Sequence, residues 1–275
     1  MSRGWILSSI ALGIVLGALF AAFPLWDVQI SDWFYDHQAH RFPLATNYDW
    51  NIVRRCANLV PYILLLPPLF VLLRKLIFPS WPMLMAPTVV IYLLGSFLIG
   101  PGLISNLLLK DEWGRPRPNS IQQFAGTVPF EPWWRPSEAC RRNCSFVSGE
   151  ASNAFWTIAP ASLAPPELRP IALASAVFFG AAVGGMRVVF GRHFVTDVGF
   201  AGVLTIFVVM ALHKLLLDPV RRNDAMLERA MERFSRGFGA LLVGMARAFL
   251  FARGQRTNWR GLERLGAIEK SQPNP

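Results

Sequence analysis

The stretch GMRVVFGRHFVTDVGF, residues 185–200, lies between two long apolar segments and contains four ionisable side chains: Arg187, Arg192, His193 and Asp197. On insertion scales, an ionised residue at the centre of a membrane helix costs about 2.5–3.5 kcal/mol. Ionisable side chains concentrated between two apolar runs therefore need a compensating role. The pattern predicts two membrane helices joined by a short segment that carries chemistry.

The flanking runs belong to a pattern that extends along the whole chain. Hydrophobic residues make up 53% of the 275 residues and charged residues 16%, whereas soluble domains carry about 25% charged residues. Uncharged runs long enough to cross a hydrocarbon core recur along the sequence. They predict an all-α, polytopic membrane bundle of six transmembrane helices, at about 5–26, 57–74, 82–107, 149–165, 170–189 and 195–217.

Two other interpretations of the apolar runs are less consistent with the sequence. Buried helices of a large soluble protein would need more polar sequence to cover them than this chain contains. Residues 5–26 could form a secretory signal peptide, but the run is long for that role and its small-residue cleavage pattern is weak. A retained first span is therefore favoured.

Lysine and arginine near the span ends predict the orientation in the membrane. Arg3, Arg74, Arg169 and the basic C-terminal tail share one side if six spans alternate, so both termini are expected in the cytoplasm. The loop 27–53, with four aspartates and one arginine, suits the outer side. The loop 110–144 holds one lysine and five arginines yet also falls outside, so either these cations have a function there or the alternation is wrong.

The tail, residues 219–275, is expected to be separate from the membrane domain at 1–218. It carries ten arginines and one lysine against five acids, and the whole chain has a formal charge of +10. Apolar residues at helical spacing between the arginines predict an amphipathic helix on an anionic inner leaflet. Nucleic-acid binding is the rival explanation, but the tail follows a membrane span and is too apolar. A reentrant or spanning segment near 237–252 is a further alternative.

Three clusters of polar residues fall on one membrane face in this arrangement. They are KDEWGRPRP at 110–118, CSFVSGEAS at 144–152, and the opening stretch at 185–200. Helices that break where charged side chains and backbone amides meet can form an anion site. The sequence therefore predicts a site for an anionic group, such as a phosphate, at that face.

Each cluster contributes a different group to the predicted site. Lys110 supplies a point charge and Arg117 a planar fork, and both suit phosphate oxygens. Ser148 and Gly149 lie where a loop enters a helix, so their backbone amides could face an anion. Arg187 is expected to be a third cation.

The third cluster also contains a candidate nucleophile. His193 can attack phosphorus, and Asp197 lies one helical turn later, at i+4. A hydrogen bond from the imidazole to this carboxylate would select the ring tautomer and stabilise the imidazolium, as in a nucleophile–base–orienter triad.

These motifs resemble the three signatures of the type 2 phosphatidic acid phosphatase (PAP2) superfamily, which is related to the vanadium haloperoxidases. Lys110, Arg117 and Pro118 match K-x6-R-P, Ser148 and Gly149 match the centre of P-S-G-H, and Arg187, His193 and Asp197 match R-x5-H-x3-D. The resemblance covers about residues 50–217. It implies a haloperoxidase-like helical core, a metal-independent phosphomonoesterase without a cofactor, and a phosphohistidine intermediate on His193.

The sequence departs from the family pattern at three positions. Val147 replaces a proline and Met186 a serine, and both changes are mild. Glu150 replaces the histidine to which the family assigns protonation of the leaving oxygen. Glu150 could itself be the general acid, could pair with an arginine to order the site, or could mark a weakened, non-catalytic relative. The presence of His193 and Asp197 disfavours the last reading.

Two arginines and two cysteines have less certain roles. Arg115 and Arg192 lie beside motif residues and are candidates for substrate contact, although interfacial snorkelling explains them equally well. Cys140 and Cys144 are as consistent with a disulfide as with two free thiols. No metal-ligand spacing is present, so no metal or cofactor is predicted.

The resemblance implies a function as well as a fold. The segments GRPRP and SFVSGE are similar to those of bacterial lipid A phosphatases, with the 4′ position favoured. This predicts a multi-pass inner-membrane enzyme that acts on an anionic lipid on the periplasmic side, in contact with membrane lipids and not with nucleic acid. The alternatives are hydrolysis of undecaprenyl diphosphate or phosphatidylglycerophosphate, and a non-catalytic phospholipid-binding or transport protein.

Overall fold

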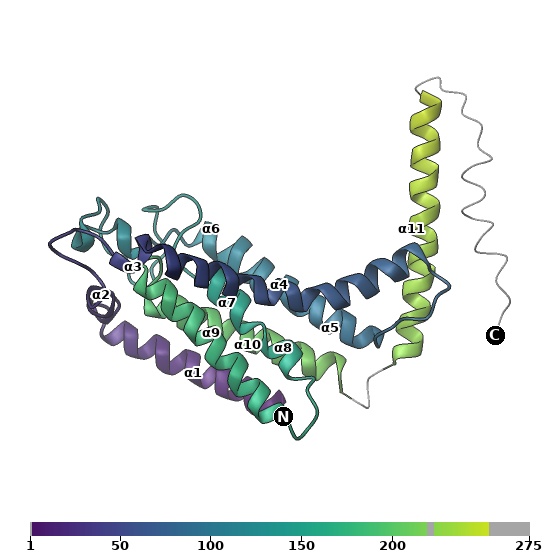
Figure 1. Ribbon diagram of the computed structural model, residues 1–275, viewed down its shortest axis with the longest axis horizontal. Helices are drawn as coiled ribbons and strands as arrows, with labels where there is room; N and C mark the ends of the chain where they lie inside the picture. The colour runs from purple at the N-terminus through teal and green to yellow at the C-terminus, as the bar shows by residue number, and fades with distance from the viewer. Residues whose placement is uncertain (1, 219–222, 253–275) are drawn as a thin grey trace. The chain divides into compact units, whose positions relative to one another are not determined.

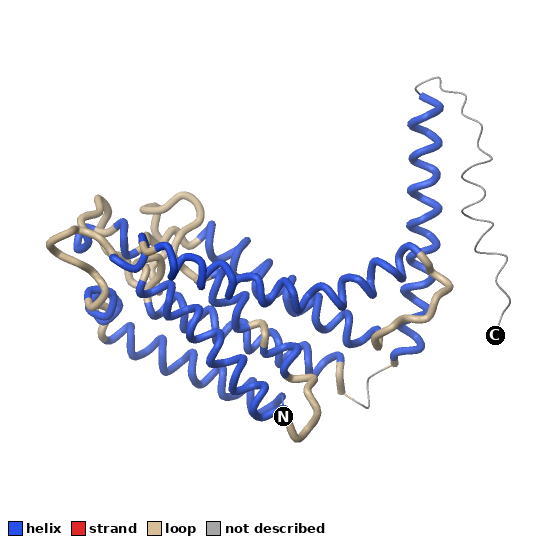
Figure 2. The backbone as a smooth tube through the Cα atoms, in the orientation of Figure 1, coloured by secondary structure: helices blue, strands red, loops and turns tan. Residues whose placement is uncertain are grey.

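The structure, a computed structural model, describes residues 2–218 and 223–252. The regular elements of these residues are helices joined by loops, as Figure 2 shows. In chain order (Figure 1) they are α1 (Ser2–Ala22), α2 (Trp26–Asp32), α3 (Pro43–Thr46), α4 (Tyr48–Ile77), α5 (Pro87–Phe97), η1 (Leu98–Leu109), α6 (Lys110–Glu112), η2 (Pro118–Ser120), η3 (Gln122–Phe124), α7 (Gly149–Phe155), α8 (Ile158–Ala161), α9 (Arg169–Val189), α10 (Val195–Leu216) and α11 (Asp224–Ala252).

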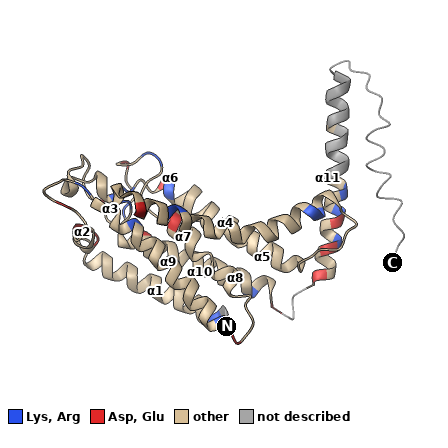
Figure 3. Ribbon diagram, viewed as in Figure 1, with Lys and Arg blue, Asp and Glu red and all other residues tan. Residues whose placement is uncertain are grey.

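The predicted all-α membrane fold is confirmed. Within the described residues, five helices are long and apolar enough to cross a membrane: Arg3–Ala22, Tyr48–Ile77, Pro87–Glu112, Arg169–Val189 and Val195–Leu216. Large apolar side chains such as Leu7, Leu66 and Phe178 are exposed on them, as is expected for surfaces that face lipid. Figure 3 shows few charged residues along α1, α5, α9 and α10. The chain is a multi-pass membrane protein.

The fourth predicted span, 149–165, differs from the prediction because it is two short helices, α7 and α8, separated by a turn at 156–157. Pro160 has no backbone N–H and its ring clashes with the carbonyl four residues earlier, which is that of Trp156. The helix therefore breaks at that point. Apolar length alone could not reveal this break.

Two other helices differ from the prediction, one in its start and one in its backbone geometry. α4 begins at Tyr48, nine residues before the predicted start at 57, so its first turns carry polar side chains. The helix Pro87–Glu112 widens to a π-helix over η1, which contains Pro101. Since Pro101 cannot donate a backbone hydrogen bond, the regular α ladder is interrupted there. The side-chain amide of Asn106 donates to the Pro101 carbonyl at 2.7 Å.

The described residues form two compact units, one within 1–67 and 91–222 and the other within 68–90 and 223–275. In the first unit α1 packs against α10, and α7 packs against α9 and α10. The α1–α10 contact is close: a Cβ on Gly199 would lie 2.5 Å from Leu16. Small residues allow membrane helices to approach each other in this way.

The second unit contains α11, the helix of the basic tail. Asp224 accepts hydrogen bonds from the backbone N–H and the hydroxyl of Thr88, at 3.0 and 2.7 Å. Glu228 accepts from the backbone N–H of Met83 at 2.8 Å. The alternative of a reentrant segment near 237–252 falls on this one helix, which is not among the five apolar spans of the described residues.

Candidate active site

His193 lies in the tight turn that joins α9 to α10. Gly191 in this turn has φ +61, and a Cβ there would lie 2.3 Å from the ring of Phe42, so only glycine fits. The backbone N–H groups of Arg192 and His193 both donate to the carbonyl of Arg187, at 3.0 and 3.2 Å. The turn therefore holds the imidazole, which is 2% exposed, inside the end of the bundle.

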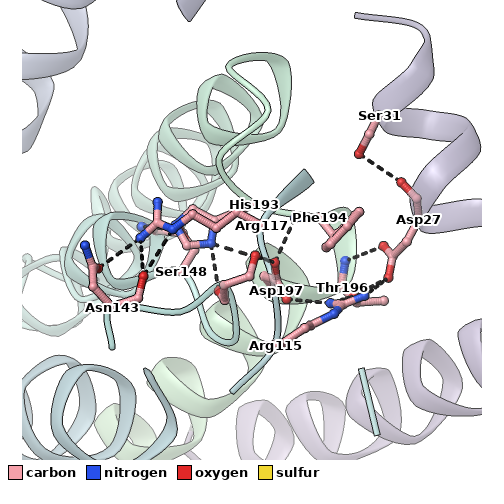
Figure 4. Close-up of polar contacts among 12 residues, drawn as sticks. Asp27, Ser31, Arg115, Arg117, Asn143, Ser148, His193, Phe194, Thr196 and Asp197 are labelled. Atoms are coloured by element: carbon pink, nitrogen blue, oxygen red, sulfur yellow. Dashed lines mark hydrogen bonds and ion pairs between the residues drawn. The ribbon is translucent and has the colours of Figure 1, made fainter. Parts of the chain in front are cut away.

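The acceptor that orients His193 is not the one predicted. Nδ1 lies 2.7 Å from the carbonyl oxygen of Ser145 but 3.7 Å from Oδ2 of Asp197, too far for a hydrogen bond (Figure 4). A carbonyl only accepts, so Nδ1 carries the proton in this contact. Nε2 then has the free lone pair that a nucleophile needs.

Asp197 is fully buried and acts on several groups around His193. Its carboxylate accepts from Nη1 of Arg115 at 2.5 Å, from the hydroxyl of Ser145 at 2.5 Å, and from the backbone N–H of Phe194 at 2.8 Å. It thus caps the start of α10 and holds Ser145, whose carbonyl orients the imidazole. Its negative charge also lies close enough to stabilise an imidazolium.

Arg115 does not face a substrate, which corrects the sequence prediction. Its side chain is fully buried. The guanidinium donates to Asp27 at 2.8 Å, to Asp197, to the hydroxyl of Thr196 and to the carbonyl of Glu131. Figure 4 shows this group on the far side of Asp197 from Arg117. Arg115 therefore neutralises two buried carboxylates.

Arg117 lies beside the His193 ring on the other side (Figure 4). Its Nε and Nη2 donate to the carbonyl of Asn143 at 3.1 and 2.8 Å, and Nη2 also donates to the Asn143 side-chain oxygen at 2.9 Å. A disulfide between Cys140 and Cys144 closes the loop that contains Asn143. The alternative of a disulfide, left open by the sequence, is the one present, and it supports the residue that anchors Arg117.

Lys110 and Gly149 bring the first two motifs together. A Cβ on Gly149 would lie 3.2 Å from the Lys110 ammonium and 2.2 Å from the side-chain oxygen of Asn106. The backbone N–H of Ser148 donates to the carbonyl of Asp197 at 3.1 Å. Ser148 therefore cannot offer its amide to an anion, which corrects that part of the prediction, and only its hydroxyl is available.

Glu150 is bound by residues that the sequence did not single out. Its Oε1 accepts from Nη1 of Arg54 at 2.8 Å and its Oε2 from the amide of Asn58 at 2.6 Å. Nη1 of Arg187 lies 3.5 Å from Oε1. These partners stabilise the ionised carboxylate, so the geometry favours the reading in which Glu150 pairs with arginines and orders the site. In the sequence, the one local feature that could have pointed to Arg54 and Asn58 is their i, i+4 spacing at the start of an apolar helix.

Arg187 and Arg192 complete the set of predicted cations. Arg187 is 7% exposed, and its positive charge repels those of Arg117 and of a protonated His193. Arg192 is exposed, and its charge acts on Arg117. A substrate contact by Arg192 stays a prediction.

The electrostatics of the site keep His193 neutral. Burial lowers the pKa of the imidazole to about 4, because an imidazolium loses its hydration inside the protein, and the charges of Arg117 and Arg187 act in the same direction. Asp197 opposes this effect without cancelling it.

A neutral His193 predicts an unusual pH dependence. The ring is expected to stay unprotonated as the pH falls until it reaches about 4, and only below that should the nucleophile be lost. Histidine-selective ¹³C NMR of the protein in detergent micelles, assigned with His193→Gln, measures this directly. Titration of the assigned ring near 6.5, the ordinary value, would contradict the buried geometry.

Gly149→Ala is expected to displace the Lys110 side chain, because the new methyl group overlaps Asn106 and contacts the ammonium. A shift of about 1 Å in a catalytic arrangement can lower the rate about 100-fold. The measurement is phosphate release by purified variants. Gly185→Ala is the matched control, since a Cβ there meets nothing within 4 Å, and equal activity of the two variants would refute the predicted contact.

His193 has a neutral imidazole with a free lone pair near Arg117 and Arg187, whose charges also act on Lys110. In a membrane protein, such a set of residues has the chemistry to bind and attack a phosphate group. The sequence comparisons agree with this class. The chain belongs to the PAP2 superfamily, whose profile matches residues 66–221, and it is a phosphatase, a phosphoric monoester hydrolase.

Named relatives support this assignment. The chain is 32% identical over 216 residues to a lipid A 4′-phosphatase of Francisella tularensis subsp. novicida, which covers 77% of this chain and 97% of the relative. It is 38% identical over 119 residues to a lipid A 4′-phosphatase of Rhizobium leguminosarum, which covers 43% of this chain and 51% of the relative. A Rhizobium etli protein of the same name is 37% identical over 119 residues, with 43% and 46% covered. No solved structure matches the chain.

Proposed function

We propose that the chain removes the 4′-phosphate of lipid A. The observation that carries this proposal is the similarity to the Francisella enzyme over nearly that protein's whole length. A lipid substrate suits a site at the end of membrane helices, where a phosphorylated head group meets the bilayer surface. Lys110, Arg117 and Arg187 would attract such a head group by charge.

The proposed reaction begins with the phosphate held by these three cations. Nε2 of His193 attacks phosphorus in line, the N–P bond forms, and the P–O bond to the sugar breaks. The Ser145 carbonyl and the Asp197 charge stabilise the imidazolium character that develops on the ring. The leaving oxygen takes a proton from water, because Glu150 is paired with Arg54 and Asn58 as a carboxylate. Water then hydrolyses the phosphohistidine and releases inorganic phosphate.

We also propose that the site faces the periplasm of a bacterial inner membrane and that both termini are cytoplasmic. The Cys140–Cys144 disulfide supports this side, because disulfides persist in oxidising compartments. The acidic segment 27–53 contributes Asp27 to the same end of the bundle. Residues 1–218 would then form the phosphatase domain, and the basic tail would lie on the anionic inner leaflet. Of the tail, only 223–252 is among the described residues.

The proposed function is tested by substrate hydrolysis in detergent micelles. Purified wild-type protein is incubated separately with lipid A, undecaprenyl diphosphate and phosphatidylglycerophosphate. We expect phosphate release from lipid A, and tandem mass spectrometry should locate the loss at the 4′ rather than the 1 position. If another of these lipids is hydrolysed in preference, that lipid and not lipid A is the substrate. Binding without phosphate release from any of the three lipids would indicate the non-catalytic alternative.

A further inference from the structure

One oxygen of Glu150 lies between two guanidinium groups. Oε1 is 2.8 Å from Nη1 of Arg54 and 3.5 Å from Nη1 of Arg187, and these two arginines come from α4 and α9. Asn58 holds the other carboxylate oxygen at 2.6 Å. Glu150 thus brings Arg54 to the same place as Arg187, a cation of the proposed phosphate site.

Both arginines keep a buried donor that no neighbour satisfies. Among the residues that the structure describes, Nε of Arg54 and Nε of Arg187 are buried and have no hydrogen-bond acceptor. Buried N–H donors nearly always have an acceptor in native proteins, and exceptions call for a ligand or a functional reason. Arg187 is only 7% exposed, so solvent does not satisfy its Nε–H donor.

The charges favour a phosphate as the missing acceptor. Lys110, Arg117, Arg187 and Arg54 carry four positive charges, and Glu150 carries one negative charge. Without Arg54, the Glu150 carboxylate would repel a phosphate that approaches Arg187. With Arg54 present, the net charge of these five groups is three positive rather than two, and the carboxylate is paired.

We propose that Arg54 is a fourth phosphate-binding residue, whose Nε–H donates to a phosphate oxygen together with that of Arg187, while Glu150 positions both guanidiniums. The proposal rests on the proposed function in so far as a phosphate is the group bound. It assigns Arg54 a direct contact with the substrate and Glu150 a positioning role. It also explains how an acidic residue is tolerated at position 150.

The competing explanation is that Arg54 only neutralises Glu150. A double-mutant cycle separates the two explanations, because neutralisation is not needed once the carboxylate is removed. The variants are Arg54→Ala, Glu150→Ala and the double variant, with Arg54→Lys as a milder change. Arg55→Ala is the matched control, since Arg55 is the next residue of α4 and is exposed.

Binding of inorganic phosphate to each purified protein is measured by isothermal titration calorimetry in detergent, after thermal unfolding has shown that the variant is folded. We expect the double variant to bind phosphate at least about tenfold more weakly than Glu150→Ala, since a charge-assisted hydrogen bond is lost. Arg55→Ala should bind as the wild type does.

Equal phosphate affinity of the double variant and Glu150→Ala would overturn the proposal and leave the lipid phosphatase function intact. Conversely, loss of phosphate affinity in the double variant, in a protein that does not hydrolyse lipid A, would uphold the proposal and reject only the substrate. If the alanine variants do not fold, Arg54→Lys decides: a phosphate affinity equal to that of the wild type overturns the proposal, because lysine keeps the charge but lacks the Nε–H donor.

Discussion

Protein with His193→Ala is expected to release no inorganic phosphate from lipid A above the level of a protein-free blank. Removing a nucleophile whose neighbours act with it as a unit lowers the rate by about 10⁴-fold or more. The effect should be this large because His193 is the proposed nucleophile and its ring is oriented by the Ser145 carbonyl at 2.7 Å. The measurement is release of inorganic phosphate under single-turnover conditions.

His37→Ala is the control for His193→Ala, because His37 is exposed and contacts Asp32 and the ring of Tyr35 rather than site residues. This variant should keep wild-type activity. The site predicts in addition that His193→Ala still binds inorganic phosphate, since the cations are unchanged. Substantial turnover by His193→Ala would exclude the phosphohistidine route.

The second large effect concerns folding rather than chemistry. Arg115→Met leaves the carboxylates of Asp27 and Asp197 buried without their shared counter-charge. Breaking a buried ion pair by removing one partner lowers the free energy of unfolding by about 3–5 kcal/mol. Thermal unfolding in detergent micelles should therefore show a much less stable protein.

Two comparisons make the Arg115 prediction specific. Arg135→Met removes an arginine whose side chain is exposed and whose ion pair with Glu131 is long, at 3.8 Å. Little change in stability is therefore expected. Adding Asp27→Asn to Arg115→Met removes one of the two unpaired buried charges and should restore part of the stability. If the double variant is less stable than Arg115→Met, the three residues do not form the coupled network described here.

Arg115 and Arg117 illustrate where sequence reasoning succeeded and failed. The two arginines are two residues apart and look alike in the sequence, and both were candidates for contact with an anion. Their neighbours in space separate them: Arg115 is buried against Asp27 and Asp197, whereas Arg117 lies beside His193 and is held by Asn143. No local pattern around GRPRP distinguishes these environments.

The helices, too, could be predicted only in part from the sequence. Hydropathy predicted the long apolar helices because membrane spans depend on the composition of contiguous residues. It could not predict that 149–165 breaks at 156–157 or that α4 begins at Tyr48. Both depend on local backbone chemistry and on partners elsewhere, such as Glu150, to which the polar first turns of α4 bind.

The sequence by itself determined that this is a multi-pass membrane protein of the PAP2 superfamily and which residues carry its motifs. Those properties follow from contiguous apolar runs and from the fixed spacing of the motif residues. Only the tertiary structure decided which groups hold the side chains of these motifs in place: the Ser145 carbonyl for His193, Arg115 for Asp197, and Arg54 for Glu150. These partners are 48, 82 and 96 residues apart in the chain, and only folding brings them together.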